Sequence, residues 1–413
     1  MPCSKHDYCW IDGVERLENY KPGGYHPVMI GDILHRRYHI VDKLGYGGYS
    51  TIWLARDTYL EQYVAVKIGT ANLASRETQI LRALASTSEH PGRQPIPLPL
   101  DEFEVCGPNG IHQCYTTAPA RCNLQEVSFS RLFPLEVARA LAGSLTQDIA
   151  YTHSQGYAHG DLHLRNILVR LPQSFDRLSI EQLYEEYGEP ETVDITKRNG
   201  KPLPINIAPK AVLPLYLGKD AEEFSLSDVR VILSDFGEAF APEDSRLGKD
   251  CCTPLAMRAP EARFEPQAAL SYSADIWTLA VAIWEILGMK AIFSSEFTTA
   301  DEMVSNHIGP MPLNWWDAWE ERSKFFDDAG RPKTGRHVWL PINEAFEEGV
   351  QKYRRKSKRV EEFSREETVA ILDLMRRMLA FRPEHRPTAK EVLESNWMVK
   401  WVLPDFERSL LEK

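Results

Sequence analysis

The 413-residue sequence contains no uninterrupted apolar run of membrane-spanning length and no apolar core of a secretory signal within residues 1–20. Its most apolar stretch, residues 274–293, contains Asp275 at its start and Glu285 inside it. Charged residues at such positions are typical of a buried core helix and not of a membrane span. We therefore expect a protein of the cell interior that does not bind membranes.

Cysteine pairs and excess positive charge are also lacking. The seven cysteines, of which Cys251 and Cys252 are adjacent, include no C-x-x-C pair, which predicts reduced thiols and not a disulfide framework. The net charge of −11 argues against a nucleic-acid partner, because such a partner requires a basic face. A basic peptide is the more natural partner. The one basic run, residues 353–360, is either a nuclear address or a solvated helix face, so we expect a cytoplasmic protein with the nucleus as a second location.

The pattern of apolar residues predicts an α+β fold with two lobes. Residues 38–69 alternate short β-type runs with turns, as in an antiparallel meander, and a helical run follows at residues 75–85. Beyond the proline-rich residues 90–100 the pattern becomes helical, with apolar residues four positions apart on one face. Those residues are Val137, Leu141, Leu145 and Ile149. Residues 172–228 show no clear periodicity and separate two strand-like runs, which predicts a partly ordered insertion.

A glycine-rich turn and a lysine form the first candidate site. Gly45, Gly47 and Gly48 lie between two strand-like runs, and residues without a Cβ let backbone N–H groups approach phosphate oxygens. Such a turn is more often only a tight hairpin, so it needs support from its neighbours. Lys67 provides it, because it follows apolar residues of a strand-like run and points an ammonium at the phosphates. Glu77 on the next helix is the nearest acid that would orient this ammonium.

A second candidate site lies in the stretch "AHGDLHLRNILVRL", residues 158–171. Asp161 is placed to accept the proton of an attacking hydroxyl, and Asn166 to offer a neutral oxygen to a magnesium ion. The second metal ligand should be a carboxylate, and Asp235 in "LSDFGEAF" follows a strand-like run. These residues occur, after the glycine turn and Lys67, in the order that phosphoryl transfer requires.

At these residues the sequence resembles a eukaryotic protein kinase, from about residue 38 to residue 401. Three downstream residues match further positions of that family: Glu261 in "RAPE", Asp275 at the start of an apolar helix, and Arg386 in "RPEHRPTAKEVL". In the family the glutamate is held by the arginine, and the aspartate receives backbone N–H groups of the catalytic loop. Within the family, residues 18–57 are most similar to the SR-protein kinase group, including Ser50 where most kinases have a third glycine.

The resemblance implies a bilobal fold, a serine/threonine kinase activity with ATP and Mg2+, and a basic or Arg/Ser-rich protein substrate bound by a monomer. It divides the chain into an extension (1–37), an N-lobe with a five-stranded sheet and one helix (38–117), a C-lobe with the insertion (118–401) and a tail (402–413). It also implies which further residues contact the nucleotide. These are Leu44, Ile52, Ala65, the Ala118 carbonyl, the Ala120 N–H and His163, with Thr117 at the back of the adenine pocket.

The sequence departs from the kinase pattern at two positions of the catalytic loop. Gly160 replaces the usual arginine, so no cation there awaits a phosphate on the activation segment. His163 replaces the usual lysine, and a neutral imidazole stabilises a transferring phosphoryl group less than an ammonium does, which predicts slow turnover. Thr253 lies one residue farther from "APE" than the family's segment threonine.

Two other readings remain open from the sequence. A kinase-shaped scaffold without activity agrees with Gly160 and His163 but not with the retained Lys67, Asp161 and Asn166. A small-molecule phosphotransferase of the aminoglycoside or choline type has a similar catalytic loop, but it lacks the "APE" segment and its arginine. Residues 314–330 mix tryptophans with acids in a region where the SR-protein kinase group has an acidic docking groove. The resemblance implies such a groove here, and ordinary aromatic packing is an equal alternative.

Overall fold

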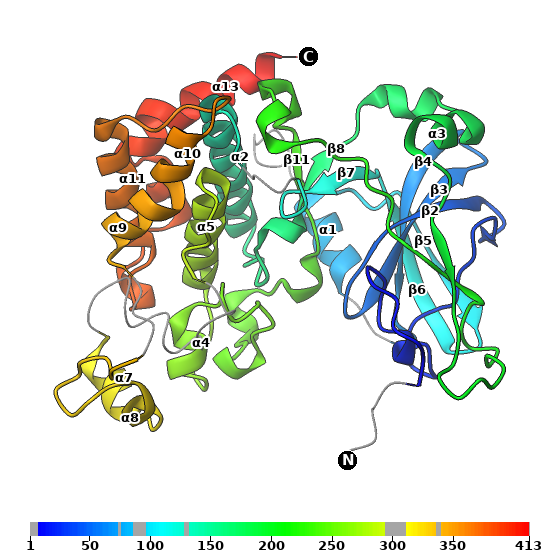
Figure 1. The fold of residues 1–413 in the computed structure, drawn as a ribbon, viewed down its shortest axis with the longest axis horizontal. Coiled ribbons are helices and arrows are strands. Elements are labelled where there is room, and N and C mark those ends of the chain that lie inside the picture. The colour runs from blue at the N-terminus through cyan, green and yellow to red at the C-terminus, as the bar shows by residue number, and fades with distance from the viewer. Residues whose placement is uncertain are drawn as a thin grey trace. The chain divides into compact units, whose positions relative to one another are not determined.

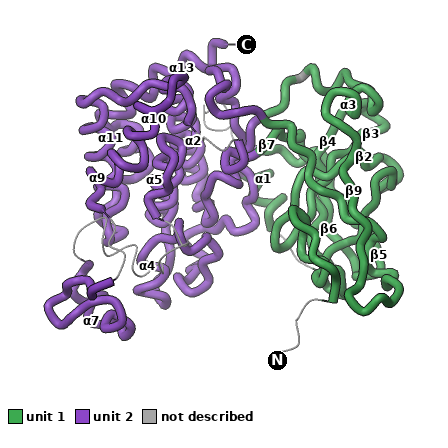
Figure 2. Tube along the Cα trace, viewed as in Figure 1, with its two compact units in different colours: residues 1–83, 97–122, 170–218 green, residues 84–96, 123–169, 219–413 purple. Residues whose placement is uncertain are grey.

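The structure is a computed structural model, and it describes residues 7–72, 76–85, 96–127, 132–293, 311–335 and 340–412. The chain forms two compact units, shown in Figure 2. Unit 1 comprises residues 1–83, 97–122 and 170–218, and unit 2 comprises residues 84–96, 123–169 and 219–413. A sheet dominates unit 1 and helices dominate unit 2 (Figure 1), which confirms the expected α+β class with two lobes.

The sheet of unit 1 has six strands in the order β1-β2-β3-β4-β6-β5, one more than expected. The added strand is β1, whose two residues pair with the start of β2 and come from the region expected to be an extension. All neighbouring strands are antiparallel, as the meander pattern predicted. The bounds are β1 Ile33–Leu34, β2 Tyr38–Tyr46, β3 Ser50–Asp57, β4 Gln62–Gly69, β5 Asp101–Gly107 and β6 Gly110–Thr117. Helix α1, Glu77–Ala85, lies where the helical run was predicted.

The N-terminal segment, residues 7–31, is part of unit 1. Its aromatic residues Tyr8, Tyr20 and Tyr25 are buried in one cluster with residues of the inserted segment. A buried ion pair between Glu15 and Lys43 of β2 adds a link to the sheet, and the Tyr20 hydroxyl donates to the same carboxylate. Residues expected to be an extension therefore contribute to the core of the unit.

The inserted segment also folds onto unit 1 up to residue 218, whereas we expected it to be partly ordered within the mainly α lobe. It contains helix α3, Ile180–Tyr187, and a hairpin of β9, Thr192–Asp194, and β10, Lys210–Val212. Phe175 and Leu183 pack against Val41, Leu54 and Tyr63 of the sheet. Elements of three to eight residues are too short to give a periodic signal, which explains why the sequence pattern missed them.

Two long helices form the centre of unit 2. Helix α2, Leu135–Ser154, buries the apolar stripe predicted from the sequence. Helix α5, Tyr272–Leu287, begins at the Ser271 cap and is buried over nearly all its length, as expected of a core helix. Among the described residues, none of the helices is both long and apolar enough to cross a membrane.

Short helices and the antiparallel strands β8, Ile167–Arg170, and β11, Val231–Leu233, complete unit 2. The order of this small sheet is β11-β8-β7, and β7, Ala120–Asn123, has its first three residues in unit 1. The helices are α4 Pro260–Phe264, α7 Leu313–Ala318, α8 Arg322–Phe325, α9 Ile342–Phe346, α10 Lys352–Lys356, α11 Arg365–Met378, α12 Ala389–Leu393 and α13 Leu403–Leu411. Helix α13 includes most of the expected tail, and it packs on α2, where Arg139 binds Glu367 and Asp405.

The basic run at residues 353–360 is tied into unit 2. Arg354 of α10 is fully buried and donates to the carbonyls of Phe133, Leu287 and Glu361. Burial lowers the pKa of Arg354 to about 9. Arg355 pairs with Glu347 and Glu362. These contacts give part of the run a structural role, which the sequence pattern did not indicate.

Candidate active site

The glycine-rich turn connects β2 and β3 in unit 1. Gly47 and Gly48 are exposed at its tip, and the Gly47 N–H donates to the Ser50 carbonyl at 2.8 Å to close the turn. Gly45 pairs in register with Ile52, and the pairing shifts between Lys43 and Gly45, so a bulge precedes the tip. The backbone at the tip of the turn is thus exposed to solvent, which would allow phosphate oxygens to approach it.

Lys67 lies in the middle of the same sheet. It pairs in register with Ile52 on one side and Tyr115 on the other. Its ammonium donates to both carboxylate oxygens of Glu77, at 2.9 and 2.8 Å. Glu77 is buried in the first turn of α1, and the Lys67 side chain is 18% exposed. The predicted partnership of this lysine and this acid is confirmed.

The residues expected around adenine follow directly on β6. Thr117 ends β6 and pairs in register with Ala65 of β4, and Ala118 and Pro119 connect to Ala120 at the start of β7. Ala65 is buried, whereas Leu44 at the end of β2 is half-buried. The structure therefore brings Ala65 and Thr117 side by side, and their part in nucleotide binding remains a prediction.

Asp161, His163 and Asn166 come together in the loop before β8 of unit 2. The Asn166 side-chain amide donates to the Asp161 carbonyl at 2.9 Å, and the His163 Nε2 atom lies 3.5 Å from Asp161 Oδ2. Asp161 Oδ1 and His163 Nδ1 are buried, and neither has a hydrogen-bond partner among the described residues. A buried carboxylate oxygen without a partner is costly, so this geometry suits a ligand that supplies a hydroxyl.

Asp235 is placed beside Asn166 by strand pairing. Ile167 of β8 pairs with Leu233 of β11, and both the N–H and the hydroxyl of Ser234 donate to the Asn166 carbonyl, at 2.8 and 3.0 Å. Asp235 follows directly with φ of 63°, a left-handed conformation that is unusual for a residue with a Cβ. Such strained conformations cluster at functional sites. A carboxylate and a carboxamide at adjoining strand ends are oxygen ligands of the kind that Mg2+ takes.

Asp275 accepts hydrogen bonds from the backbone of the catalytic loop, as the kinase resemblance implied. Its carboxylate accepts the N–H groups of His159 and Gly160 at 2.6 and 3.0 Å, and a 2.9 Å bond from His153 Nε2. Burial opposes its ionisation, but the hydrogen bond and charge of His153, together with His159, lower the pKa of Asp275 below its ordinary value. The histidine on α2 was not singled out in the sequence, since a lone histidine on an apolar helix carries no signal of a distant partner.

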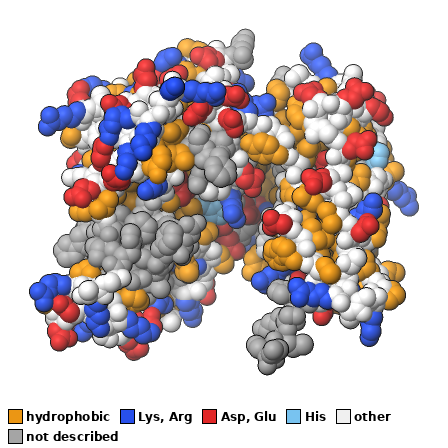
Figure 3. Space-filling view, viewed as in Figure 1, with side chains coloured by type: hydrophobic (Ala, Val, Ile, Leu, Met, Phe, Trp, Pro, Cys, Tyr) orange, Lys and Arg blue, Asp and Glu red, His pale blue; other side chains and the backbone are white. Residues whose placement is uncertain are grey.

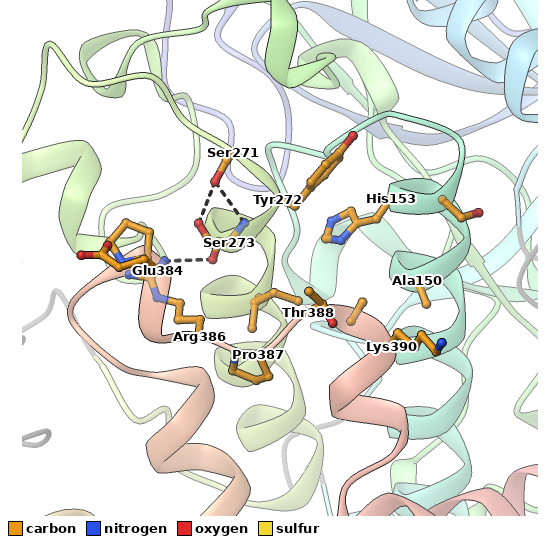
Figure 4. A pocket seen from close by; sticks show the side chains of 14 residues that line it. Ala150, His153, Ser271, Tyr272, Ser273, Glu384, Arg386, Pro387, Thr388 and Lys390 are labelled. Carbon is orange, nitrogen blue, oxygen red and sulfur yellow. Dashed lines mark hydrogen bonds between the residues drawn. The ribbon is translucent and has the colours of Figure 1, made fainter.

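The predicted pair of Glu261 and Arg386 is also confirmed. The guanidinium makes a two-pronged bond to the carboxylate, at 2.8 and 2.6 Å, with both side chains buried. It donates further to the carbonyls of Ala380, Phe381 and Ser273. Figure 4 shows Arg386 beside Ser273, at the start of α5. The pair therefore links the segment after Asp235 to the helical core.

Thr253, whose role the sequence left undecided, contacts the catalytic loop. Its hydroxyl donates to the Gly160 carbonyl at 2.8 Å, and Arg258 donates twice to the Thr253 carbonyl. Farther on, Trp315 and Trp319 are buried among phenylalanines. Ordinary aromatic packing is therefore present in this region, and the acids there pair locally, as Glu321 does with Lys324.

A pocket of about 630 Å³ opens elsewhere in unit 2 (Figure 4). It is lined by residues of α2, the start of α5 and the segment 383–390, including His153, Tyr272 and Lys390. None of the residues predicted to bind nucleotide or metal lines it. The described cysteines form no disulfide, in line with reduced thiols, and Cys3 lies outside the described residues.

Comparisons with known proteins agree with these geometries. The model of the protein kinase domain matches residues 222–398, which include Asp235, Glu261, Asp275 and Arg386. A serine/threonine protein kinase of Aspergillus fumigatus is 26% identical over 93% of this chain and 90% of its own. SRSF protein kinase 3 of Homo sapiens is 30% identical over 40% of this chain and 30% of its own.

A solved kinase domain shares the fold. It superposes with a TM-score of 0.60, at 18% identity, and the match covers 91% of this chain and 98% of that one. Three contacts within the chain agree with a protein kinase fold. They are the Lys67–Glu77 ion pair, the hydrogen bonds from the catalytic loop to Asp275, and the buried Glu261–Arg386 pair. Residues 222–398 thus form a protein kinase domain, and the chain is similar to serine/threonine protein kinases, among them an SRSF protein kinase.

Proposed function

We propose that this kinase transfers the γ-phosphate of ATP to serine hydroxyls in basic, Arg/Ser-rich protein substrates, with Asp161 as the residue that accepts the hydroxyl proton. The observation that carries the proposal is the buried Asp161 Oδ1 atom, which has no partner among the described residues. The substrate hydroxyl would donate to this oxygen, and the carboxylate would orient it for attack.

The remaining residues position the nucleotide. Gly47 and Gly48 offer backbone to its phosphates, and Lys67, oriented by Glu77, donates to them. Asn166 and Asp235 would hold Mg2+, whose charge neutralises the phosphate oxygens when it is bound. The Asn166 amide nitrogen is engaged by the Asp161 carbonyl, which leaves the amide oxygen to act as the ligand atom. Catalysis would then depend mainly on positioning and charge neutralisation.

The substrate class rests on charge and on the relatives. The chain carries a net charge of −11, and on the face shown in Figure 3 acidic side chains are interspersed with basic ones. Basic peptides are favoured over nucleic acid by this balance. One relative, SRSF protein kinase 3, is named after a protein substrate. The Glu261–Arg386 pair supports the segment on which kinases present a peptide, so a protein acceptor is favoured over a small molecule.

The test offers purified protein radiolabelled ATP and Mg2+ with three acceptors: an Arg-Ser repeat peptide, the same peptide with lysine for arginine, and an aminoglycoside. We expect label on the Arg-Ser peptide first. Asp161→Asn should abolish transfer and leave nucleotide binding nearly intact, while the exposed control Asp373→Asn should behave as wild type. Label on the aminoglycoside alone would identify a small-molecule phosphotransferase. Equal transfer by wild type and Asp161→Asn would contradict the role of Asp161, and no transfer by the wild type to any acceptor would leave only a kinase-shaped scaffold.

A further inference from the structure

The tip of the glycine-rich turn is tethered to the N-terminal segment by a tyrosine. The Tyr25 hydroxyl donates to the Gly47 carbonyl at 2.7 Å, with the Gly48 carbonyl at 3.4 Å. Tyr25 is only 3% exposed, although both glycines are exposed. A buried side chain therefore contacts the two glycines at the tip, whose backbone has the greatest conformational freedom in the turn.

The direction of this contact fixes the direction of two N–H groups. In a trans peptide the carbonyl and the N–H of the next residue point in opposite directions. With the Gly47 carbonyl turned toward Tyr25, the Gly48 N–H must point away from it, and the Gly48 carbonyl does the same for the Tyr49 N–H. Within the described residues, neither N–H donates to another protein atom. The tether thus presents two adjacent donors on one side of the turn, as an anion-binding concavity requires.

Tyr25 is itself held in place at several points. Its carbonyl accepts the Asn109 side-chain amide at 2.7 Å, and the Gly24 carbonyl accepts the Ala71 N–H at 2.9 Å. Tyr20 packs edge-on against the Tyr25 ring at 5.5 Å. Burial raises the pKa of Tyr25 above its ordinary value, so the phenol stays protonated and continues to donate. The anchor is therefore rigid enough to restrict the turn that it contacts.

We propose that Tyr25 is a positioning residue that orders the phosphate-binding turn before the nucleotide arrives, so that the N–H groups of Gly48 and Tyr49 already face its triphosphate. This inference rests on the proposed function. Binding to a preordered turn costs less conformational entropy than binding to a free glycine-rich turn. The tether should act on the phosphates more than on adenine, because the residues expected around adenine lie on the strands β2, β3 and β4 and in the segment after β6, and not at the tip of the turn.

The test compares Tyr25→Phe with Tyr184→Phe, which loses an equivalent bond from a tyrosine hydroxyl to the Val41 carbonyl in the same unit. Calorimetry with Mg2+ and either a non-hydrolysable ATP analogue or adenosine measures binding without any turnover. One net hydrogen bond corresponds to a loss of about threefold to tenfold in affinity. We expect Tyr25→Phe to weaken the ATP analogue by this factor and to leave adenosine binding unchanged, with both ligands unaffected in Tyr184→Phe.

Hydrogen exchange of residues 44–52 in the nucleotide-free protein provides a second measurement. Exchange there should accelerate in Tyr25→Phe and not in Tyr184→Phe. Unchanged affinity and exchange would overturn the inference, and so would an equal loss for the ATP analogue and adenosine, which indicates general destabilisation. Failure of the wild type to bind either ligand would instead refute the proposed function, and the exchange comparison would still show whether Tyr25 orders the turn.

Discussion

A buried histidine in unit 1 predicts that acid selectively destabilises this unit. His26 is 9% exposed, its Nδ1 atom has no partner among the described residues, and its ring lies edge-on to His112 at 4.8 Å. Burial, together with the nearby charge of His112, lowers the pKa of His26 to about 4. The His112 Nδ1 atom contacts the Gly69 carbonyl at 2.9 Å, and burial lowers the pKa of His112 as well. His112 therefore provides no negative charge that would stabilise a protonated His26.

The sign and size of the effect follow from proton linkage. Because the pKa of His26 is lower in the folded chain, the unfolded chain binds more protons between pH 6.5 and about 4. Its contribution to stability is complete above pH 6.5 and is lost as the pH falls toward 4. Between pH 7.5 and 5.5 the loss is about 1.4 kcal/mol by linkage, or about 1 kcal/mol after allowance for solvent screening.

The assay is thermal unfolding at pH 7.5 and 5.5, compared between wild type and His26→Phe. A loss of about 1 kcal/mol corresponds to a melting point lower by about 2 to 4 °C in a domain of this size. We expect His26→Phe to reduce the acid-induced drop by that amount, and the exposed control His35→Gln to leave it as in wild type. An equal drop in wild type and His26→Phe would refute the assignment of His26 as a buried neutral group.

Two further predictions concern unit 2. Glu261→Gln leaves the buried Arg386 guanidinium without its counter-ion. It should therefore lower the free energy of unfolding, measured by urea titration, by about 3 kcal/mol or more. A change below about 1 kcal/mol would contradict the structural role of the pair. His163→Lys replaces the imidazole, whose Nε2 atom lies 3.5 Å from Asp161 Oδ2, by an ammonium. It should raise kcat on a peptide substrate by about tenfold. An unchanged or lower kcat in steady-state assays would show that the imidazole does not limit turnover.

The sequence was sufficient where chemistry forces distant residues to meet. Lys67 and Glu77 were paired from residue type and order, whereas the contacts of Asp275 with the loop N–H groups and of Glu261 with Arg386 were expected from the kinase resemblance. All three agree with the rule that a buried charge requires a partner of opposite charge or a set of hydrogen bonds. The two-lobed class followed from the change of period from strand to helix. These inferences depend on residue type and order, which the sequence states directly.

The sequence was insufficient where backbone groups or short elements make the contact. The Tyr25 hydroxyl binds carbonyls of a turn 22 and 23 residues away, and Asn206 donates to the Tyr20 carbonyl 186 residues away. Every residue carries a carbonyl, so no residue type marks such a partner. Arg354 shows the same limit, since carbonyls surround a guanidinium that looked like part of a solvated basic run.

The glycine at position 160 has a structural reason that the sequence did not show. Gly160 has φ of +77°, and a Cβ there would lie 2.6 Å from the Glu238 carbonyl oxygen, so an arginine would need the backbone to move. The same carbonyl accepts a hydrogen bond from Arg246 Nη1 at 2.5 Å, and Arg246 also binds the Glu238 carboxylate and the Asp250 carbonyl. A guanidinium at this place thus comes from residue 246 and not from residue 160. Because the Glu238 carboxylate already neutralises it, we predict that a phosphate is not needed to order residues 238–250.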